Sequence, residues 1–326
     1  LGDVYKRQSL ILMSSTKMIA ARDPYGFRPL CYGRMPDGTY VAASESCALA
    51  AVGAEFIRDV LPGEILVFTE NGVESRKEHC GKQKKTTCIF EYIYFARPDS
   101  TIDGVSVHEA RRKAGELLAK TDPVDADIVI GVPDSGLDAA LGYARRSGIP
   151  YGIGLIKNKY IGRTFIFPGK KERMDQVRIK LSPVRSVIEG KKVVLIDDSI
   201  VRGTQLRETT EFLYQSGAKE VHVRPACPPL LYGCKYLNFS RSKSDLDLIT
   251  RRIIREWEGD NDVNVLGEYA DPNSDRYAAM LEEIRKRQNF TSLRYHRLDD
   301  LLESIGIDPC NVCTYCCLLY TSDAAD

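Results

Sequence analysis

The feature that most constrains this chain is a buried strand that ends in two carboxylates and leads into a loop able to bind an anion. Val193 to Ile196 are four consecutive apolar residues, three of them β-branched, which is the pattern of a parallel strand covered on both faces. Asp197 and Asp198 follow at its carboxyl end, where open α/β sheets bind ligands. These carboxylates could accept hydrogen bonds from vicinal hydroxyls or face a hydrated divalent metal ion.

The residues after this carboxylate pair suit a phosphate group. Backbone N–H groups without a helical partner, together with the helix dipole, favour an anion at the start of the next helix. The candidate binding residues of this loop are Ser199, Val201, Arg202, Gly203 and Thr204. Acidic residues after a strand also occur in response regulators and metal-dependent hydrolases, so the carboxylate pair alone leaves these classes open.

A second turn of the same kind lies at residues 131–136. Its candidate residues are Asp134, Ser135 and Gly136. Their side chains and the amides that open the following helix could hold a pyrophosphate from the side opposite to the Asp197 loop. Turns rich in Gly and Ser are common in α/β folds, so this turn alone is a weak signal.

A cationic segment with several glycines, residues 154–173, follows a predicted strand and ends well before the next one. Such a segment predicts a lid that closes over a substrate. Composition alone favours an ordinary solvated basic loop.

Size and charge limit the possible functions. The 326 residues are enough for two domains. Lys and Arg number 46 against 45 acidic residues, so no overall field points to nucleic acid or to a membrane surface. No apolar run is long enough to span a bilayer. Ten cysteines without a secretory signal indicate a reducing, cytoplasmic compartment and metal or cluster binding rather than disulfides.

The periodicity changes along the chain. Residues 9–85 combine short strands with turn signals, which predicts a β-rich region. Residues 86–235 alternate strands at 127–132, 151–156, 191–196 and 220–224 with helices at 106–120, 136–147 and 203–216, which predicts a doubly wound, mainly parallel sheet. Residues 236–316 are polar and helical. Residues 1–8 and 317–326 follow no earlier pattern, and we expect them to be a non-native leader and tail.

Taken whole, residues 192–204 resemble the phosphoribosyl pyrophosphate signature of type I phosphoribosyltransferases. The further motifs narrow the resemblance to the glutamine phosphoribosylpyrophosphate amidotransferase family. Residues 21–30 and 43–48 look like the closing part of its N-terminal-nucleophile glutaminase domain. The resemblance implies a type I phosphoribosyltransferase α/β fold preceded by a partial, N-terminally truncated glutaminase domain.

The resemblance also implies roles for single residues. Ser135, Asp197 and Asp198 would contact Mg²⁺ and phosphoribosyl pyrophosphate. The 154–173 segment is similar to the catalytic loop of the family, so Lys157, Tyr160 and Arg163 are the candidates for closing over substrate and neutralising the leaving pyrophosphate.

The implied activity is that of a pentosyltransferase at the first committed step of purine synthesis. It forms 5-phosphoribosylamine and pyrophosphate from phosphoribosyl pyrophosphate and ammonia, which glutamine supplies in the intact enzyme. The resemblance implies purine nucleotides as feedback inhibitors and a homo-oligomer. The family's glutaminase uses a cysteine at the mature N-terminus, whereas this chain starts with Leu1 and both Cys31 and Cys47 are internal. We therefore expect the chain as written to use free ammonia.

Four cysteines form a further group. Cys310 and Cys313 have C-x-x-C spacing, and Cys88 and Cys234 lie beside other motifs. Thiolates in this arrangement suit a tetrahedral zinc ion equally well. The resemblance implies a structural [4Fe-4S] cluster, which one branch of the family carries. Cys316 is a near neighbour that could compete as a ligand.

The chain departs from the family pattern in two places. Gln205 stands where a second Thr is usual after the phosphate loop, and about twenty extra residues separate Cys234 from Cys310. Backbone amides carry much of the phosphate binding, so the loss of one hydroxyl costs little. The insertion affects the expected geometry of the last two cluster ligands.

Two other functions remain as alternatives. A non-catalytic regulator with this fold, which senses phosphoribosyl pyrophosphate and binds DNA, would carry a basic N-terminal domain and a degenerate lid. A salvage or orotate phosphoribosyltransferase would be shorter and would lack the glutaminase remnant and the four cysteines. The β-rich start, the intact lid and the cysteines favour the amidotransferase.

Overall fold

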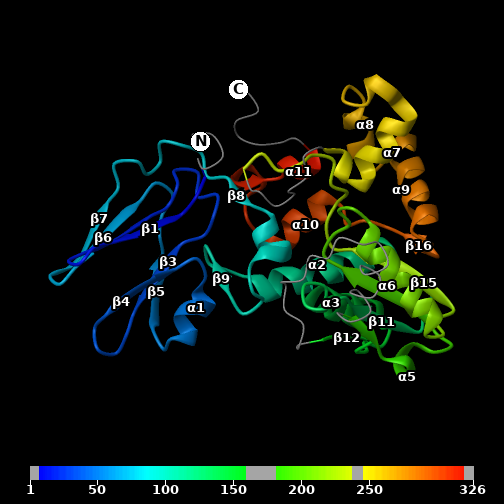
Figure 1. The fold of residues 1–326 in the computed structure, drawn as a ribbon, viewed down its shortest axis with the longest axis horizontal. Helices are drawn as coiled ribbons and strands as arrows, with labels where there is room; N and C mark the ends of the chain where they lie inside the picture. The colour runs from blue at the N-terminus through cyan, green and yellow to red at the C-terminus, as the bar shows by residue number, and fades with distance from the viewer. Residues whose placement is uncertain (1–6, 159–180, 237–244, 319–326) are drawn as a thin grey trace, which may run out of the picture.

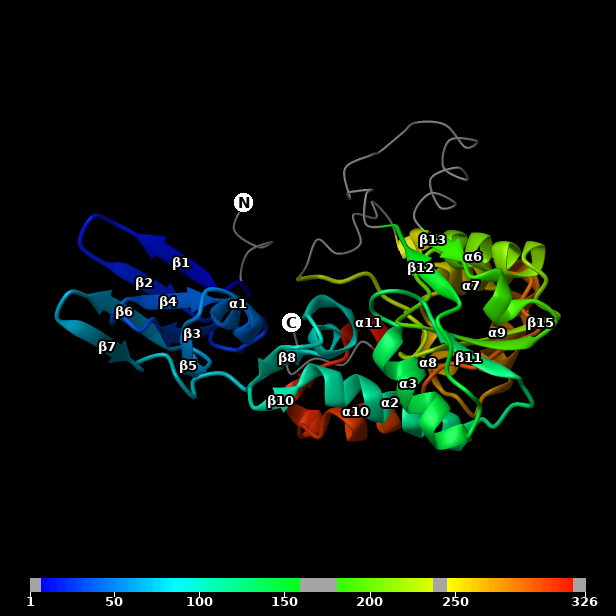
Figure 2. The ribbon, with the colours of Figure 1, turned by 90° about the horizontal axis from the view of Figure 1, so that it is seen from below.

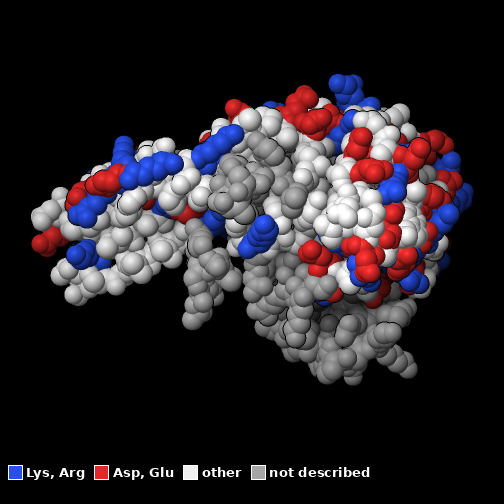
Figure 3. All heavy atoms as spheres, turned by 90° about the horizontal axis from the view of Figure 1, so that it is seen from above, with Lys and Arg blue, Asp and Glu red and all other residues white. Residues whose placement is uncertain are grey.

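The computed structural model describes residues 7–158, 181–236 and 245–318. A β-rich region and an α/β region lie at opposite ends, and short strands and helices from distant parts of the chain connect them (Figures 1 and 2). None of the helices in the described ranges is long and apolar enough to cross a membrane. On the face drawn in Figure 3, acidic and basic residues interleave over the helical end of the molecule.

The β-rich region contains two antiparallel sheets, as the alternating pattern and turn residues predict. The first has the order β1-β2-β6-β7, and the second has the order β4-β3-β5. Their strands are β1 (Leu10–Met13), β2 (Met18–Ala21), β3 (Cys31–Arg34), β4 (Tyr40–Ala43), β5 (Glu55–Asp59), β6 (Ile65–Thr69) and β7 (Gly72–Arg76), with helix α1 (Ser46–Ala51) after β4. The hairpin between β6 and β7 turns at Glu70 and Asn71, because Thr69 pairs with Gly72, the first residue of β7.

The α/β region is built on a parallel sheet of order β11-β14-β15-β16. Its strands are β11 (Ile128–Gly131), β14 (Lys192–Asp197), β15 (Glu220–Pro225) and β16 (Ser292–Leu293). Alternate residues of each strand face opposite sides, so Val193 and Leu195 pack in one core cluster while Val194 and Ile196 pack in another. Helices cover both faces, which confirms the predicted doubly wound sheet.

The helices divide between the two faces of this sheet. Helices α2 (Val107–Thr121) and α3 (Leu137–Ser147) pack on the side of Val194. Helices α6 (Thr204–Gln215), α7 (Ile249–Glu258) and α9 (Asp275–Arg287) pack on the side of Leu195. Two short helices, α5 (Arg185–Ile188) and α8 (Leu266–Ala270), lie beside these layers.

One predicted strand differs from the structure. We predicted a strand at 151–156, but only β12 (Leu155–Lys157) forms, and it pairs antiparallel with β13 (Leu181–Pro183) rather than joining the parallel sheet. Tyr151 makes a single bridge to Val129. A side chain at Gly154 would lie 2.7 Å from that of Ile130, so this glycine lets the chain pass close over the sheet edge instead of continuing the ladder.

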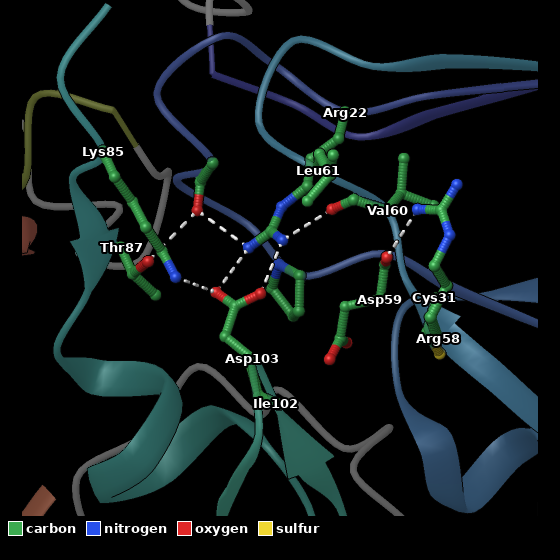
Figure 4. A network of polar contacts seen from close by, with 12 residues as sticks. Arg22, Cys31, Arg58, Asp59, Val60, Leu61, Lys85, Thr87, Ile102 and Asp103 are labelled. Atoms are coloured by element: carbon green, nitrogen blue, oxygen red, sulfur yellow. Dashed lines mark hydrogen bonds and ion pairs between the residues drawn. The ribbon is translucent and has the colours of Figure 1, made fainter. Parts of the chain in front are cut away.

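The connecting layer contains β8 (Thr87–Cys88), the π-helix η1 (Glu91–Phe95), the hairpin of β9 (Thr101–Ile102) and β10 (Val105–Ser106), α10 (Leu298–Ile305), β17 (Val312–Cys313) and α11 (Tyr315–Leu318). Its core includes Phe27, Ile89 and Ile305. Figure 4 shows the polar contact that ties the β-rich region to this layer: the buried Arg22 guanidinium donates to both Asp103 carboxylate oxygens, at 2.7 and 2.9 Å. Lys85 lies 2.9 Å from the same carboxylate.

Candidate active site

The two predicted anion-binding turns open into one cavity of about 690 Å³. The β11–α3 turn contributes Asp134 and Ser135, and the β14–α6 loop contributes residues 197–204. Because β11 and β14 are neighbouring parallel strands, their carboxyl ends meet at the same edge of the sheet. The fold therefore brings together motifs that are more than sixty residues apart in the sequence.

A hydrogen bond joins the two turns directly. The Ser135 hydroxyl donates to Asp198 Oδ1 at 2.6 Å, and the Ser199 hydroxyl donates to Asp198 Oδ2 at 2.5 Å. The Asp198 amide donates to Asp197 Oδ1 at 2.9 Å. Burial, followed by the neighbouring Asp198 carboxylate, holds the pKa of Asp197 well above its usual range. A bound cation or hydroxyl donors would favour the charged form again.

The phosphate loop gets its shape from Gly203. This residue has a φ of 80° and immediately precedes helix α6. A side chain here would lie 2.8 Å from Gln288 and from Ile249, so both the conformation and the packing require glycine. The Ile249 amide donates to the Val201 carbonyl at 2.9 Å, which fixes the loop from helix α7.

Other predicted residues of the loop have different surroundings. Arg202 forms an exposed ion pair with Asp247 at 2.9 Å, so its guanidinium pairs with a residue other than Asp197 and Asp198. Thr204 is the first residue of α6 and lines the cavity. Gly136 precedes α3, and a side chain there would lie 2.5 Å from the Ile196 carbonyl oxygen. This glycine therefore permits the close approach of the two turns.

Of the three predicted lid candidates, the structure describes Lys157. It lies at the end of β12, lines the cavity and forms an exposed ion pair with Asp134. Lys157 therefore contacts the predicted pyrophosphate turn. Tyr160 and Arg163 lie outside the described residues.

The sequence did not predict one wall of the cavity, residues 94–98. Arg111 of α2 lines the cavity beside it, donating to the carbonyls of Tyr92 and Ala96 at 2.8 Å each. Burial lowers the pKa of this guanidinium. The aromatic run before Arg97 was visible in the sequence, but its position against the cavity depends on contacts from distant residues.

A second cavity, of about 30 Å³, brings cysteines together. Its lining includes Cys88, Cys234, Cys313 and Cys316 among mostly apolar side chains. The parallel pairing of β17 with β8 sets Cys313 opposite Cys88. Cys310, which we predicted as the fourth ligand, is exposed and does not line this cavity, whereas Cys316 does. Over the ranges that the structure describes, no three His, Cys, Asp or Glu side chains are placed to hold a single metal ion.

Comparisons with known proteins agree with this geometry. Residues 105–227 match the family model of the phosphoribosyl transferase domain. An amidophosphoribosyltransferase of Methanocaldococcus jannaschii is 43% identical over 94% of this chain and 62% of the relative. One of Bacillus subtilis is 51% identical over 70% of this chain and 48% of the relative. The chain thus spans about half to three fifths of the length of these curated relatives.

A solved structure gives the same result for the fold. The glutamine phosphoribosylpyrophosphate amidotransferase of B. subtilis, complexed with ADP and GMP, superposes with a TM-score of 0.77 at 40% identity, covering 96% of this chain and 65% of that one. The likeness includes both the β-rich and the α/β regions. Over the part that it spans, the chain is therefore similar to amidophosphoribosyltransferases, and its residues 105–227 match the phosphoribosyl transferase domain.

Proposed function

We propose that the larger cavity is the site of phosphoribosyl transfer, where phosphoribosyl pyrophosphate and ammonia give 5-phosphoribosylamine and pyrophosphate. The observation that carries this proposal is the Ser135–Asp198 hydrogen bond, which joins two anion-binding turns at the edge of one cavity. The relatives are named as enzymes, which favours catalysis over a regulator that only senses the same ligand.

The reaction explains the kinds of residue in the cavity. Displacement of pyrophosphate builds positive charge on the ribose ring and negative charge on the leaving group, so positioning and electrostatics can supply the catalysis. Asp197 and Asp198 accept hydrogen bonds from the ribose hydroxyls, and the amides of residues 199–204 hold the phosphate. The 134–136 turn holds the pyrophosphate, and Lys157 adds positive charge beside that turn.

We also propose that Mg²⁺ binds with the substrate near Ser135, Asp197 and Asp198. Carboxylate and hydroxyl oxygens are hard donors, which suit Mg²⁺ when substrate oxygens and water complete its coordination. The ion would supply positive charge that stabilises the departing pyrophosphate. The side chains of this chain orient the ribose and keep the two turns together.

For the cysteine cavity we propose a structural [4Fe-4S] cluster held by Cys88, Cys234, Cys313 and Cys316, with Cys316 in place of the predicted Cys310. Four thiols in an apolar setting fit such a group. Anaerobically purified protein should be brown and contain about four irons per chain. The matched variants Cys316→Ser and Cys310→Ser separate the two assignments, because only the first should lose iron. A colourless sample with stoichiometric zinc would support a tetrahedral zinc site instead.

The remaining predictions concern partners. We propose that glutamine supplies the ammonia in the longer proteins to which this chain is similar. We further propose that purine nucleotides inhibit the activity and that the protein is a cytoplasmic homo-oligomer. The B. subtilis structure in complex with ADP and GMP supports the choice of these two nucleotides as the first inhibitors to assay.

Asp197→Asn tests the assignment of the transfer site. The substitution removes a charge and almost no volume, so we expect pyrophosphate release with ammonium to fall about a hundredfold or more while the unfolding temperature stays close to that of the wild type. Asp125→Asn is a matched control, because Asp125 is exposed and pairs with Lys192 at the opposite end of the same strand. Unchanged turnover in Asp197→Asn would remove the carboxylate pair from the proposed mechanism.

A further inference from the structure

The β-rich region holds the wall of the transfer cavity that residues 94–98 form. Glu45, which precedes helix α1, accepts two hydrogen bonds at Oε2 from the connecting layer: from the Arg97 amide at 2.8 Å and from the buried Ser100 hydroxyl at 2.9 Å. The Cys47 thiol, within the β-rich region, is a third donor to this oxygen at 3.8 Å. The next residue, Ser46, accepts at its hydroxyl from the Thr101 amide at 2.8 Å. Two adjacent side chains therefore fix the turn that directly follows the wall.

A second contact reaches the start of the same wall. Arg28 forms an ion pair with the buried Glu91, the first residue of η1, and its guanidinium lies 4.8 Å from the centre of the Phe95 ring. On the other side, Arg111 of α2 holds the Tyr92 and Ala96 carbonyls. The wall thus lies between two anchors, one within the phosphoribosyltransferase domain and one from the β-rich region.

We propose that Glu45 is a positioning residue for phosphoribosyl transfer, acting from the β-rich region on the cavity wall at residues 94–98. This inference rests on the proposed function of the cavity. Glu45 itself does not line the cavity. It acts by fixing the backbone at Arg97, the residue that together with Pro98 ends the wall.

The chemistry of the contact explains why a carboxylate suits this position. One Glu45 oxygen accepts hydrogen bonds from a backbone amide and from a hydroxyl at the same time. A charged acceptor makes stronger hydrogen bonds than a neutral one. Without it, the Arg97 amide and the buried Ser100 hydroxyl lose their acceptor. The turn can then satisfy these donors only by moving toward water, and the wall moves with it.

Three variants test the proposal by steady-state pyrophosphate release with ammonium. Glu45→Ala removes both hydrogen bonds, and we expect kcat/KM for phosphoribosyl pyrophosphate to fall about ten- to a hundredfold. Glu45→Gln retains an acceptor oxygen and should recover a large part of this loss. Glu74→Gln is the matched control, because Glu74 is exposed on β7 and pairs with the neighbouring Arg76; its kinetics should equal those of the wild type.

Hydrogen exchange supplies a measurement that does not depend on activity. In Glu45→Ala the Arg97 amide should exchange faster, while amides of the β14 strand keep their protection and the unfolding temperature changes little. If Glu45→Ala shows normal kinetics or normal exchange at Arg97, the positioning role is wrong. If the wild type itself releases no pyrophosphate, the proposed function fails instead, and the exchange experiment still decides whether Glu45 fixes the wall.

Discussion

Two apolar strands of this molecule, β1 and β14, have opposite surroundings. The four residues of β1 are all exposed, and Leu12 retains 61% of its accessible surface. The four apolar residues of β14 are completely buried, with Leu195 at 0%. Both strands carry four consecutive apolar residues, so hydrophobicity alone does not separate them. The difference lies in coverage, because helices lie over both faces of the β14 sheet, whereas β1 is an edge strand of its sheet.

Because the two sheets are covered to different extents, the two regions have different roles. The α/β region completes its own core and places the proposed transfer cavity at the edge of its sheet. The β-rich region contributes no residue to the lining of that cavity, yet it reaches the cavity wall through Glu45 and the connecting layer through Arg22. Under our proposal, the effect of the β-rich region on the transfer reaction passes through its contacts with the wall, such as those of Glu45 and Arg28.

The largest expected effect is on the buried strand. Leu195→Ala removes a fully enclosed side chain and should destabilise the α/β region by about 2–5 kcal/mol. Leu12→Ala on β1 should change stability by less than about 0.5 kcal/mol. Trp257, the single tryptophan of the chain, lies in α7 of the α/β region, so urea unfolding followed by its fluorescence measures the effect of Leu195→Ala, and circular dichroism, which also reports the β-rich region, measures that of Leu12→Ala. Equal shifts in the two variants would contradict the difference in coverage.

Arg22→Ala tests the link between the regions. It leaves the Asp103 carboxylate with Lys85 alone and removes donors from several carbonyls, including that of Val60 at 2.8 Å. We expect a loss of about 3 kcal/mol in the unfolding free energy of the β-rich region, seen by circular dichroism, with a smaller change in the Trp257 signal. Arg76→Ala, which breaks an exposed pair on β7, is the control and should have little effect. A uniform shift of both signals would show that the regions unfold as one unit.

The smallest expected effect concerns pH. Burial raises the pKa of Glu91 to about 7, against the opposing effect of Arg28. The folded state then binds a proton more tightly than the unfolded state does. The protonated Glu91 side chain therefore contributes fully to the free energy of unfolding below about pH 4.5, and this contribution is lost as the pH rises toward 7. Relative to Glu91→Gln, the wild type should lose on the order of 1 kcal/mol of stability across this range. A difference that stays constant with pH would mean that Glu91 keeps one protonation state.

Much of the α/β region could be predicted because its signals are local. Val193 to Ile196 form a continuous apolar run, and each predicted turn at 131–136 and 197–204 lies between a strand and a helix that the structure confirms. The site follows from the same signals, since the carboxyl ends of neighbouring parallel strands must meet. Both turns of the cavity could therefore be predicted from the sequence.

The features that the sequence missed depend on contacts between distant residues. Glu45 and Arg97 are 52 positions apart, and no local pattern pairs them. The ambiguity over the fourth cysteine ligand has a different origin. Cys310 with Cys313 and Cys313 with Cys316 have the same C-x-x-C spacing. Spacing therefore cannot choose between Cys310 and Cys316. We propose Cys316 because it lines the cysteine cavity, whereas Cys310, in the short helical turn Pro309–Asn311, is exposed.

The central claim is that the described cavity transfers a phosphoribosyl group. The most direct test is pyrophosphate release by the anaerobically purified chain with Mg²⁺, phosphoribosyl pyrophosphate and ammonium, with Asp197→Asn measured in parallel. The account predicts release that depends on ammonium and that falls about a hundredfold or more in the variant. A folded wild-type sample that binds phosphoribosyl pyrophosphate but releases no pyrophosphate would contradict it and would favour the regulator.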